Sequence, residues 1–182
     1  LHDRNRNPLH ILRVGSTSKI VEMIIRSIQR QDNVAIKAII QESLESHGLA
    51  VPGSAYFDPQ LGDLHGFYES LPHAHYWVVE LDNRVVGGVG IAPFGEEGTS
   101  VAELQKLYLH PSAQGMGLSH VLMAEALTFA TTHFQQCYLE TMHSLEAACA
   151  LYEKYGFIIL PEPLAGSEHS AMDAWYLKEL QR

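Results

Sequence analysis

Hydrophobic residues near the start of the chain recur first at strand-like and then at helix-like spacing. Residues 21–30, with the sequence VEMIIRSIQR, predict a first strand. Four apolar residues then recur at positions i, i+3, i+4 and i+8, on one face of a helix: Ile36, Ile39, Ile40 and Leu44. We expect Asp32 or Asn33 to cap the start of this helix, and Gly48 to end it.

The middle of the chain predicts an antiparallel sheet. Residues 49–66 hold clusters of Pro, Gly and Asp that predict a loop, and a short helix is expected near Phe67–Leu71. Three strand-like segments follow in quick succession: Tyr76–Leu81, Val85–Ala92 and Val101–Leu109. Asp82 and Asn83 form a turn pair between the first two, and Pro93–Thr99 connects the second two. Such short connections favour antiparallel pairing.

After Pro111 the pattern alternates between helix and strand. The predicted elements are a helix from Leu118 to about Thr132, a strand at Cys137–Thr141, a helix at Leu145–Lys154, and strands at Phe157–Leu160 and Trp175–Leu180. This alternation is typical of parallel strands joined by helices. The predicted fold class is therefore α/β (α+β), with a mixed sheet that is antiparallel first and partly parallel later.

The strand at Val101–Leu109 contains a break in its alternation. Ala102 and Leu104 fall on one face, whereas Leu107 and Leu109 fall on the other. An extra residue near Gln105–Lys106, forming a β-bulge, is the simplest physical cause. Such a bulge would leave backbone groups unpaired and would splay this strand from its neighbour. The alternative is a strand that is buried on both faces and has no bulge.

A glycine-rich loop precedes the helix that begins at Leu118. Gly115 and Gly117 bring bare backbone amides to the helix start, where the first amides have no partner and favour an anion. The segment Gln114–Ser119 therefore predicts an anion site, with phosphate as the expected ligand. No lysine follows the glycines as a nucleoside-triphosphatase loop requires, and His120 stands where a dinucleotide fingerprint has its third glycine. A capping loop with no ligand is the alternative.

Composition and charge narrow the classes of function. The 182 residues include 12 Lys and Arg against 21 Asp and Glu, which gives a net charge of −9. Such acidity disfavours nucleic-acid and anionic-membrane partners and is compatible with a cationic substrate. The sequence holds no run of about 18 apolar residues that would predict a transmembrane helix. Residues 1–20 are expected to be an N-terminal tail, a truncated start or a cloning remnant.

Cysteine and histidine do not predict a disulfide framework or a metal site. Cys137 and Cys149 are expected to be buried core thiols, which favours a reducing, cytoplasmic location. His73 and His75 form the one HxH step among eleven histidines, and no second ligand pair has metal spacing. We therefore expect packing or solvated histidines and no metal.

Two motifs together resemble the GNAT superfamily of N-acetyltransferases. The segment QGMGLS, preceded by LYLHP, is similar to the family's acyl-CoA pyrophosphate loop, with Gln114 and Gly117 at its first and fourth positions. The later stretch EAACALYEKYGF is similar to the family's second motif at five positions: Ala148, Leu151, Tyr152, Gly156 and Phe157. Two positions depart from the family pattern, because Ser119 replaces a Gly or Ala and Leu145 replaces an Asn.

The resemblance, which spans residues 21–182, implies one domain with an acyl-CoA N-acyltransferase fold and a centrally splayed sheet. Acetyl-CoA would be the cosubstrate, its pyrophosphate held by main-chain amides and its pantetheine arm paired with the strand edge at the bulge. The implied cofactor-binding residues are Leu107, Tyr108, Leu109, Gln114, Gly115, Met116, Gly117, Leu118 and Ser119.

The same resemblance implies catalytic residues for direct acetyl transfer to a primary amine in a ternary complex. Glu103 would be the base that takes a proton from the amine, with Glu140 as its rival. Tyr152 would be the acid that protonates the leaving thiolate, whereas Tyr108 and Tyr155 are less well placed. The acceptor is a small-molecule or peptide amine that the sequence leaves open.

Two other functions remain open at this point. The first is a non-catalytic sensor that binds acyl-CoA without turnover, which the departures at Leu145 and Ser119 keep open. The second is a protein-interaction domain with an empty loop. A homodimer formed through the final strands is also possible.

Overall fold

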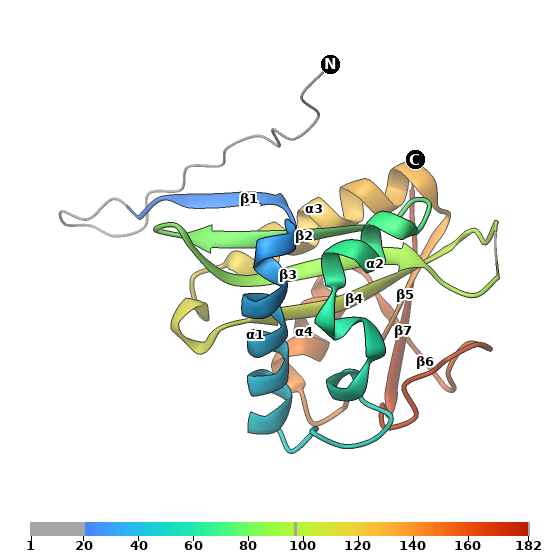
Figure 1. Cartoon of the computed structure of the whole chain (residues 1–182). Helices are drawn as coiled ribbons and strands as arrows, with labels where there is room; N and C mark the ends of the chain where they lie inside the picture. Colours follow the sequence, from blue (N-terminus) through green and yellow to red (C-terminus); the bar gives the residue numbers. More distant parts are fainter. Residues whose placement is uncertain (1–20, 97, 182) are drawn as a thin grey trace.

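A computed structural model of the chain describes residues 21–96 and 98–181. The described residues form a seven-stranded sheet with the order β1-β2-β3-β4-β5-β7-β6 (Figure 1). The strands are β1 (Met23–Ser27), β2 (His75–Leu81), β3 (Arg84–Pro93), β4 (Val101–Leu109), β5 (Gln136–Thr141), β6 (Ile158–Leu160) and β7 (Ala174–Glu179). The predicted tail at residues 1–20 lies outside the described residues, and the division into one domain over 21–182 stays a prediction.

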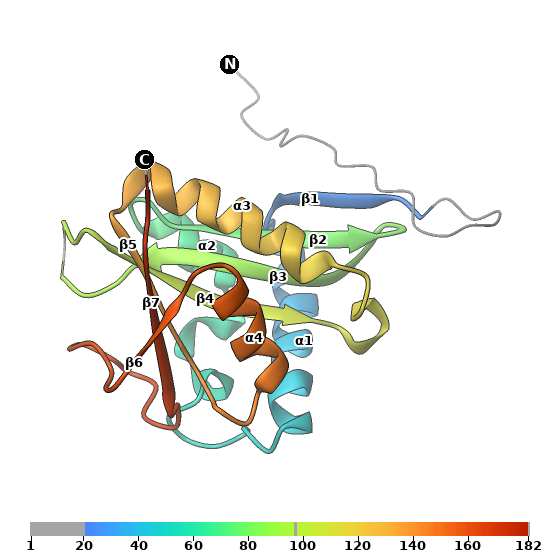
Figure 2. The ribbon, with the colours of Figure 1, turned by 180° about the vertical axis from the view of Figure 1, so that it is seen from behind.

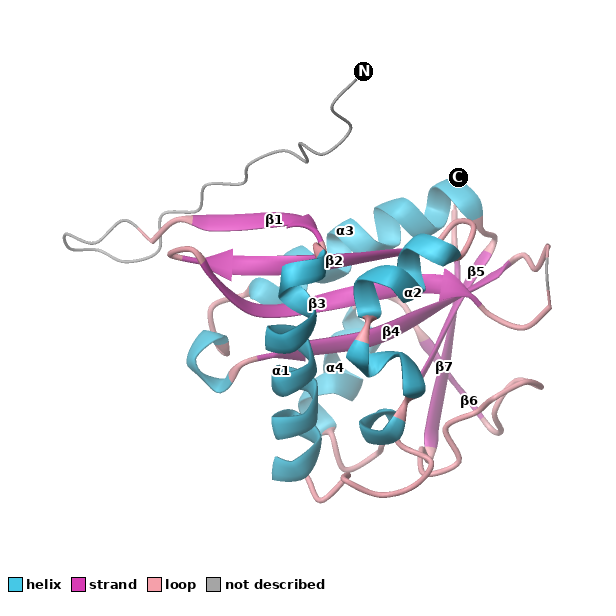
Figure 3. Ribbon diagram, in the orientation of Figure 1, coloured by secondary structure: helices cyan, strands magenta, loops and turns pink. Residues whose placement is uncertain are grey.

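Helices cover both faces of the sheet. The four α-helices are α1 (Asn33–Ser46), α2 (Leu64–Ser70), α3 (Leu118–His133) and α4 (Glu146–Lys154). Helices α1 and α2 lie on one face and α3 and α4 on the other (Figures 1–3). Each face has its own hydrophobic cluster, one with α3 and the other with α1 and α2. Within the described residues, no helix combines the length and the hydrophobicity that a membrane span requires.

The structure corrects the prediction for the start of the chain. The first strand ends at Ser27, and Arg30–Asp32 form a 3-10 turn instead of continuing it. Asp32 does not cap α1, because its carboxylate turns back to accept hydrogen bonds from Nη1 of Arg26 and the backbone amide of Gln29, both at 2.7 Å. The carboxylate of Asp32 is therefore engaged by Arg26 and Gln29 and does not accept from the first amides of α1.

Asn33 does not cap α1 either, since its side chain bonds to Asp63 (2.8 Å) and to the amide of His65 (2.9 Å). Asp63 also caps α2, accepting from the amide of Gly66, so this helix begins at Leu64 and not near Phe67. Part of the predicted loop at 49–66 forms 3-10 turns, at Ala55–Phe57 and Pro59–Gly62.

The other elements from β2 onward agree with the prediction to within one residue at each boundary. Helix α1 ends as expected, because Gly48, in a left-handed conformation, donates its amide to the carbonyl of Glu45. Cys137 is fully buried as predicted, but Cys149 is only half-buried.

The predicted bulge in β4 is confirmed. Lys106 has a positive φ of 52°, and the register with β3 pairs Gly90 with Gln105 but Gly88 with Tyr108. Two residues of β4 therefore face Val89 alone, which moves Leu107 and Leu109 to the same core as Leu104.

Strand β4 leaves its other neighbour soon after pairing with it. It pairs in parallel with β5 only over Val101–Glu103, opposite Gln136–Tyr138, and every other strand pair in the described sheet is antiparallel. Strands β1–β4 lie across the view in Figure 1, whereas β5 and β7 are steeply inclined to them. The sheet is therefore splayed in its centre, and the second half of β4 has an edge without a strand partner.

Candidate active site

The loop before α3 leaves the start of the helix open. Gly117 is the N-cap residue of α3, and both it and Gly115 have positive φ, 77° and 75°. No side chain of the described residues caps this helix start. A Cβ on either glycine would meet no atom of the described chain within 4 Å. Unpartnered amides in open space at the start of a sixteen-residue helix are a suitable site for an anion.

A groove of about 690 Å³ extends from this loop along the splayed sheet. Of the predicted cofactor-binding residues, it is lined by Leu107, Tyr108, Leu109, Gln114 and Ser119. Leu118 is buried and Met116 packs against the core, so each can offer only its backbone to a ligand. The remaining walls come from α1 and the residues just after it, from His120 of α3, and from α4 and the residues just before it.

A smaller hollow of about 110 Å³ adjoins the groove. The two share Leu44, Leu49, Leu107, Tyr108, Leu145, Ala148 and Tyr152 as lining residues. Glu103 and Glu140 line only the smaller hollow, so Tyr152 stands at the junction between the groove and the two carboxylates. The structure thus places Glu103 and Tyr152 on the walls of two adjoining hollows.

Glu103 is held by a chain of hydrogen bonds. Its Oε2 accepts from Nε2 of Gln105 at 2.6 Å, and Oε1 of Gln105 accepts from the hydroxyl of Tyr68 at 2.8 Å. Gly90 makes room for that hydroxyl, since a Cβ there would lie 2.3 Å from it. Burial, aided by the charge of Glu140, raises the pKa of Glu103 above its ordinary value. A raised pKa suits a carboxylate that takes and releases a proton near neutral pH.

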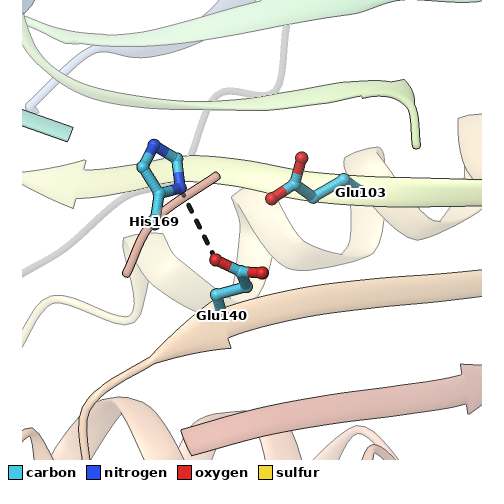
Figure 4. Close-up of side chains that lie close together, drawn as sticks. All are labelled: Glu103, Glu140 and His169. Carbon is cyan, nitrogen blue, oxygen red and sulfur yellow. Dashed lines mark ion pairs between the residues drawn. The ribbon is translucent and has the colours of Figure 1, made fainter. Parts of the chain in front are cut away.

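Glu140 and His169 complete the polar wall of the smaller hollow (Figure 4). Oε1 of Glu140 accepts from the hydroxyl of Tyr138 at 2.9 Å, and its Oε2 lies 3.7 Å from Nδ1 of His169. One ligand atom each from Glu103, Glu140 and His169 lies within 4.8 Å of the others, a spacing that could also hold a metal ion. The expected absence of a metal therefore stays a prediction.

A buried ion pair stands behind His169. Asp58 faces Nε2 of His169 at 3.0 Å and accepts from Nζ of Lys106 at 2.6 Å. The hydrogen bond to Asp58 raises the pKa of His169 above its ordinary value. Sequence reasoning missed these three residues, because they come from three segments far apart in the chain and match no motif. The sequence also predicted packing or solvated histidines. The ring of His73 stacks on that of His133, with 4.5 Å between the ring centroids.

Tyr152 is 8% exposed, and burial raises the pKa of its phenol above its usual value. The phenol therefore remains protonated across the physiological range. Of the two rival tyrosines, Tyr155 donates its hydroxyl to the carbonyl of His120 at 3.2 Å, whereas Tyr108 also lines the cavity.

An open helix start, a groove beside a splayed sheet, and a carboxylate in the adjoining hollow are the features expected of an acyl-CoA-dependent N-acyltransferase. The model of the acetyltransferase (GNAT) family matches residues 36–157. The uncharacterised N-acetyltransferase YjgM of Escherichia coli is 39% identical over 159 residues, which cover 86% of this chain and 95% of YjgM. The chain belongs to the GNAT family and is an N-acetyltransferase that uses acyl-CoA.

Solved structures agree on the fold. A GNAT-family acetyltransferase from Staphylococcus aureus is 14% identical with a TM-score of 0.76, and the match covers 87% of this chain and 99% of that one. YncA from Salmonella typhimurium, solved with its cofactor acetyl-CoA, is 21% identical with a TM-score of 0.70, and the match covers 88% of this chain and 95% of that one. These matches confirm the predicted fold class, a mixed and splayed sheet flanked by helices.

Proposed function

We propose that this enzyme transfers an acetyl group from acetyl-CoA to a primary amine, directly and within a ternary complex. One observation carries the proposal. Two adjoining hollows share Tyr152 as a lining residue, and one reaches the uncapped start of α3 while the other reaches Glu103. In this proposal the cosubstrate occupies the groove, the amine occupies the smaller hollow, and the two meet beside Tyr152 without an acyl-enzyme.

Acetyl-CoA would lie in the groove of about 690 Å³. Its diphosphate would accept hydrogen bonds from the backbone amides of residues 115–119, at the positive end of the α3 dipole. His120 and Lys154 line the same groove, and Lys154 brings a positive charge to the phosphates of this ligand in an otherwise acidic protein. The amide-rich arm would pair with the free edge of β4 at Leu107–Leu109.

The amine would enter as an ammonium and would lose two protons during the reaction. Glu103 takes the first, so that the nitrogen lone pair can attack the thioester carbonyl carbon. A backbone amide beside the bulge would stabilise the resulting oxyanion. As the C–S bond breaks, Tyr152 protonates the thiolate and recovers a proton from solvent, and the second nitrogen proton leaves as the amide forms. The net release is one proton for each amide.

Burial affects the acid and the leaving group in the same direction. The pKa of Tyr152 lies above its ordinary value, which makes it a weaker acid. A thiolate released beside it is desolvated too, and desolvation raises its proton affinity. The proton transfer therefore stays feasible in the cavity.

A thiol-release assay with acetyl-CoA and a panel of primary amines tests the proposal. We expect free CoA thiol to appear at a rate that depends on the amine. If acetyl-CoA raises the unfolding temperature but no amine releases thiol, the chain is a sensor and the proposal is wrong. If acetyl-CoA does not change the unfolding temperature, the assignment of the groove is wrong as well.

Replacing Gly117 with valine is expected to weaken CoA binding by at least about tenfold, equivalent to roughly 1.4 kcal/mol. The β-branched side chain is strained at a φ of 77° and projects into the space assigned to the diphosphate. Isothermal titration calorimetry with CoA measures the effect. Gly95→Val is the matched control, since Gly95 also has a positive φ, 88°, and open space, but lies in the β3–β4 connection. Equal affinities in both variants would contradict the assignment.

We place the reaction in the cytoplasm, because both cysteines are free thiols and acetyl-CoA is a cytoplasmic metabolite. The expected lack of nucleic-acid and membrane partners and the possible homodimer stay predictions.

A further inference from the structure

Glu140, the second carboxylate that lines the smaller hollow, has one oxygen that accepts no hydrogen bond from the described residues. The side chain of Glu140 is 3% exposed, and its Oε1 is occupied by the hydroxyl of Tyr138. Its Oε2 is buried and has no hydrogen-bond partner among the described residues. A buried carboxylate oxygen without a donor is unfavourable, so a donor brought in by a ligand is expected there. Figure 4 shows this carboxylate pointing toward Glu103 and His169.

The two positively charged or protonatable groups beside Glu140, Lys106 and His169, both contact Asp58. Nζ of Lys106, on a side chain that is 2% exposed, is held by Asp58 at 2.6 Å. Asp58 also holds Nε2 of His169, which leaves only Nδ1 of that ring toward the hollow. Two carboxylates, Glu103 and Glu140, and one imidazole, that of His169, therefore face the hollow. The charge of this site favours a cation with several N–H donors.

The rest of the hollow is narrow and mainly apolar. Its volume of about 110 Å³ is small, and Leu49, Ala55 and Met172 contribute apolar side chains to its wall. An unbranched alkyl chain fits such a passage and would place a terminal ammonium between the carboxylates. A carboxylate on the carbon next to the nitrogen would instead lie beside Glu103 and Glu140, and the one imidazole that faces the hollow, His169, already lies against Asp58 and Glu140.

We propose that Glu140 binds the acceptor ammonium, and that the acceptor is a primary amine at the end of an unbranched alkyl chain, with no carboxylate on the adjacent carbon. This inference rests on the proposed function. The ammonium donates to Oε2 of Glu140, which orients it, and gives a proton to Glu103, which keeps the role of base. Glu140 gains no proton and forms no covalent bond.

A matched pair of substrates tests the class of acceptor. Pentylamine and norleucine carry the same alkyl chain, but norleucine has a carboxylate on the carbon that bears the nitrogen. We expect kcat/KM for pentylamine to exceed that for norleucine by roughly thirtyfold or more, since an unpaired charge in a buried site is strongly disfavoured. Equal or better use of norleucine would overturn the inference and leave the proposed acetyl transfer intact. Thiol release with no amine at all would instead overturn the proposed function and this inference with it.

Glu140→Gln tests the role of the residue. We expect the KM for pentylamine to rise by roughly thirtyfold while the Kd for CoA stays unchanged, because the amide loses the charge but keeps the shape. Glu42→Gln, on the exposed side of α1, is the control for the same change of charge and is expected to keep the original KM. An unchanged KM in Glu140→Gln contradicts the proposal. Loss of activity of the unmodified enzyme on chelation would assign the carboxylates to a metal ion and would also contradict it.

Discussion

Glu103→Gln is expected to lower kcat by about 10²–10⁴-fold, the usual contribution of a general base. The amide keeps the size of the side chain, but it cannot accept the proton that the ammonium must lose before attack. Glu103 is also tied to Gln105 at 2.6 Å, so the variant should keep its place in the sheet. Steady-state kinetics with a reactive primary amine measure the effect, and the Kd for CoA should stay nearly unchanged.

The pH profile separates a base from a structural carboxylate. Only the ionised form of Glu103 accepts a proton, so kcat/KM must fall as the pH falls through the pKa of this residue. Burial and the charge of Glu140 raise that pKa, so the fall should occur at a higher pH than for an exposed glutamate. The acid limb should disappear in Glu103→Gln. A variant with an unchanged rate and profile would show that another group, with Glu140 as the first candidate, is the base.

Tyr152→Phe is expected to lower kcat by about 10²-fold, at the lower end of the range for general acids, because a thiolate leaves more readily than an alkoxide. The substitution removes only a hydroxyl, and the ring keeps its contacts with Phe157 and Tyr176. The unfolding temperature should therefore change little. Single-turnover measurements of thiol release report the step directly.

Tyr155→Phe is the matched control for Tyr152→Phe. It removes a hydroxyl from the next turn of the chain, one that is bonded to the carbonyl of His120 and lines neither hollow. We expect this variant to keep the original kcat. If both variants, or neither, slow thiol release, Tyr152 is not the acid.

The sequence predicted the elements that have strong local signals. The phase change between Leu104 and Leu107 located the bulge, because in a regular strand residues an odd number of positions apart lie on opposite faces. The glycines at 115 and 117 located the open helix start for a similarly local reason. The sequence-based prediction was wrong where another residue competes for a side chain. Arg26 takes the carboxylate of Asp32, and Asp63 takes the amide of Asn33, so neither residue caps α1.

The acceptor side of the cavity was less predictable than the cosubstrate side. The cosubstrate groove follows two contiguous motifs, whereas the acceptor hollow joins Asp58, Lys106 and His169 from three distant segments. Glu140 was considered only as a rival base. Its unpartnered oxygen becomes visible when β5 and the segment that carries His169 are placed together in space. Single ionisable residues from separate segments form no sequence motif, so the sequence alone does not reveal such a site.

A crystal structure of the enzyme with acetyl-CoA is the most direct measurement. The account predicts the diphosphate within hydrogen-bond distance of the backbone amides of residues 115–119, and the thioester at the junction where Tyr152 meets the hollow of Glu103. A diphosphate bound anywhere else, or a thioester carbon outside the reach of an amine seated at Glu103, would contradict it.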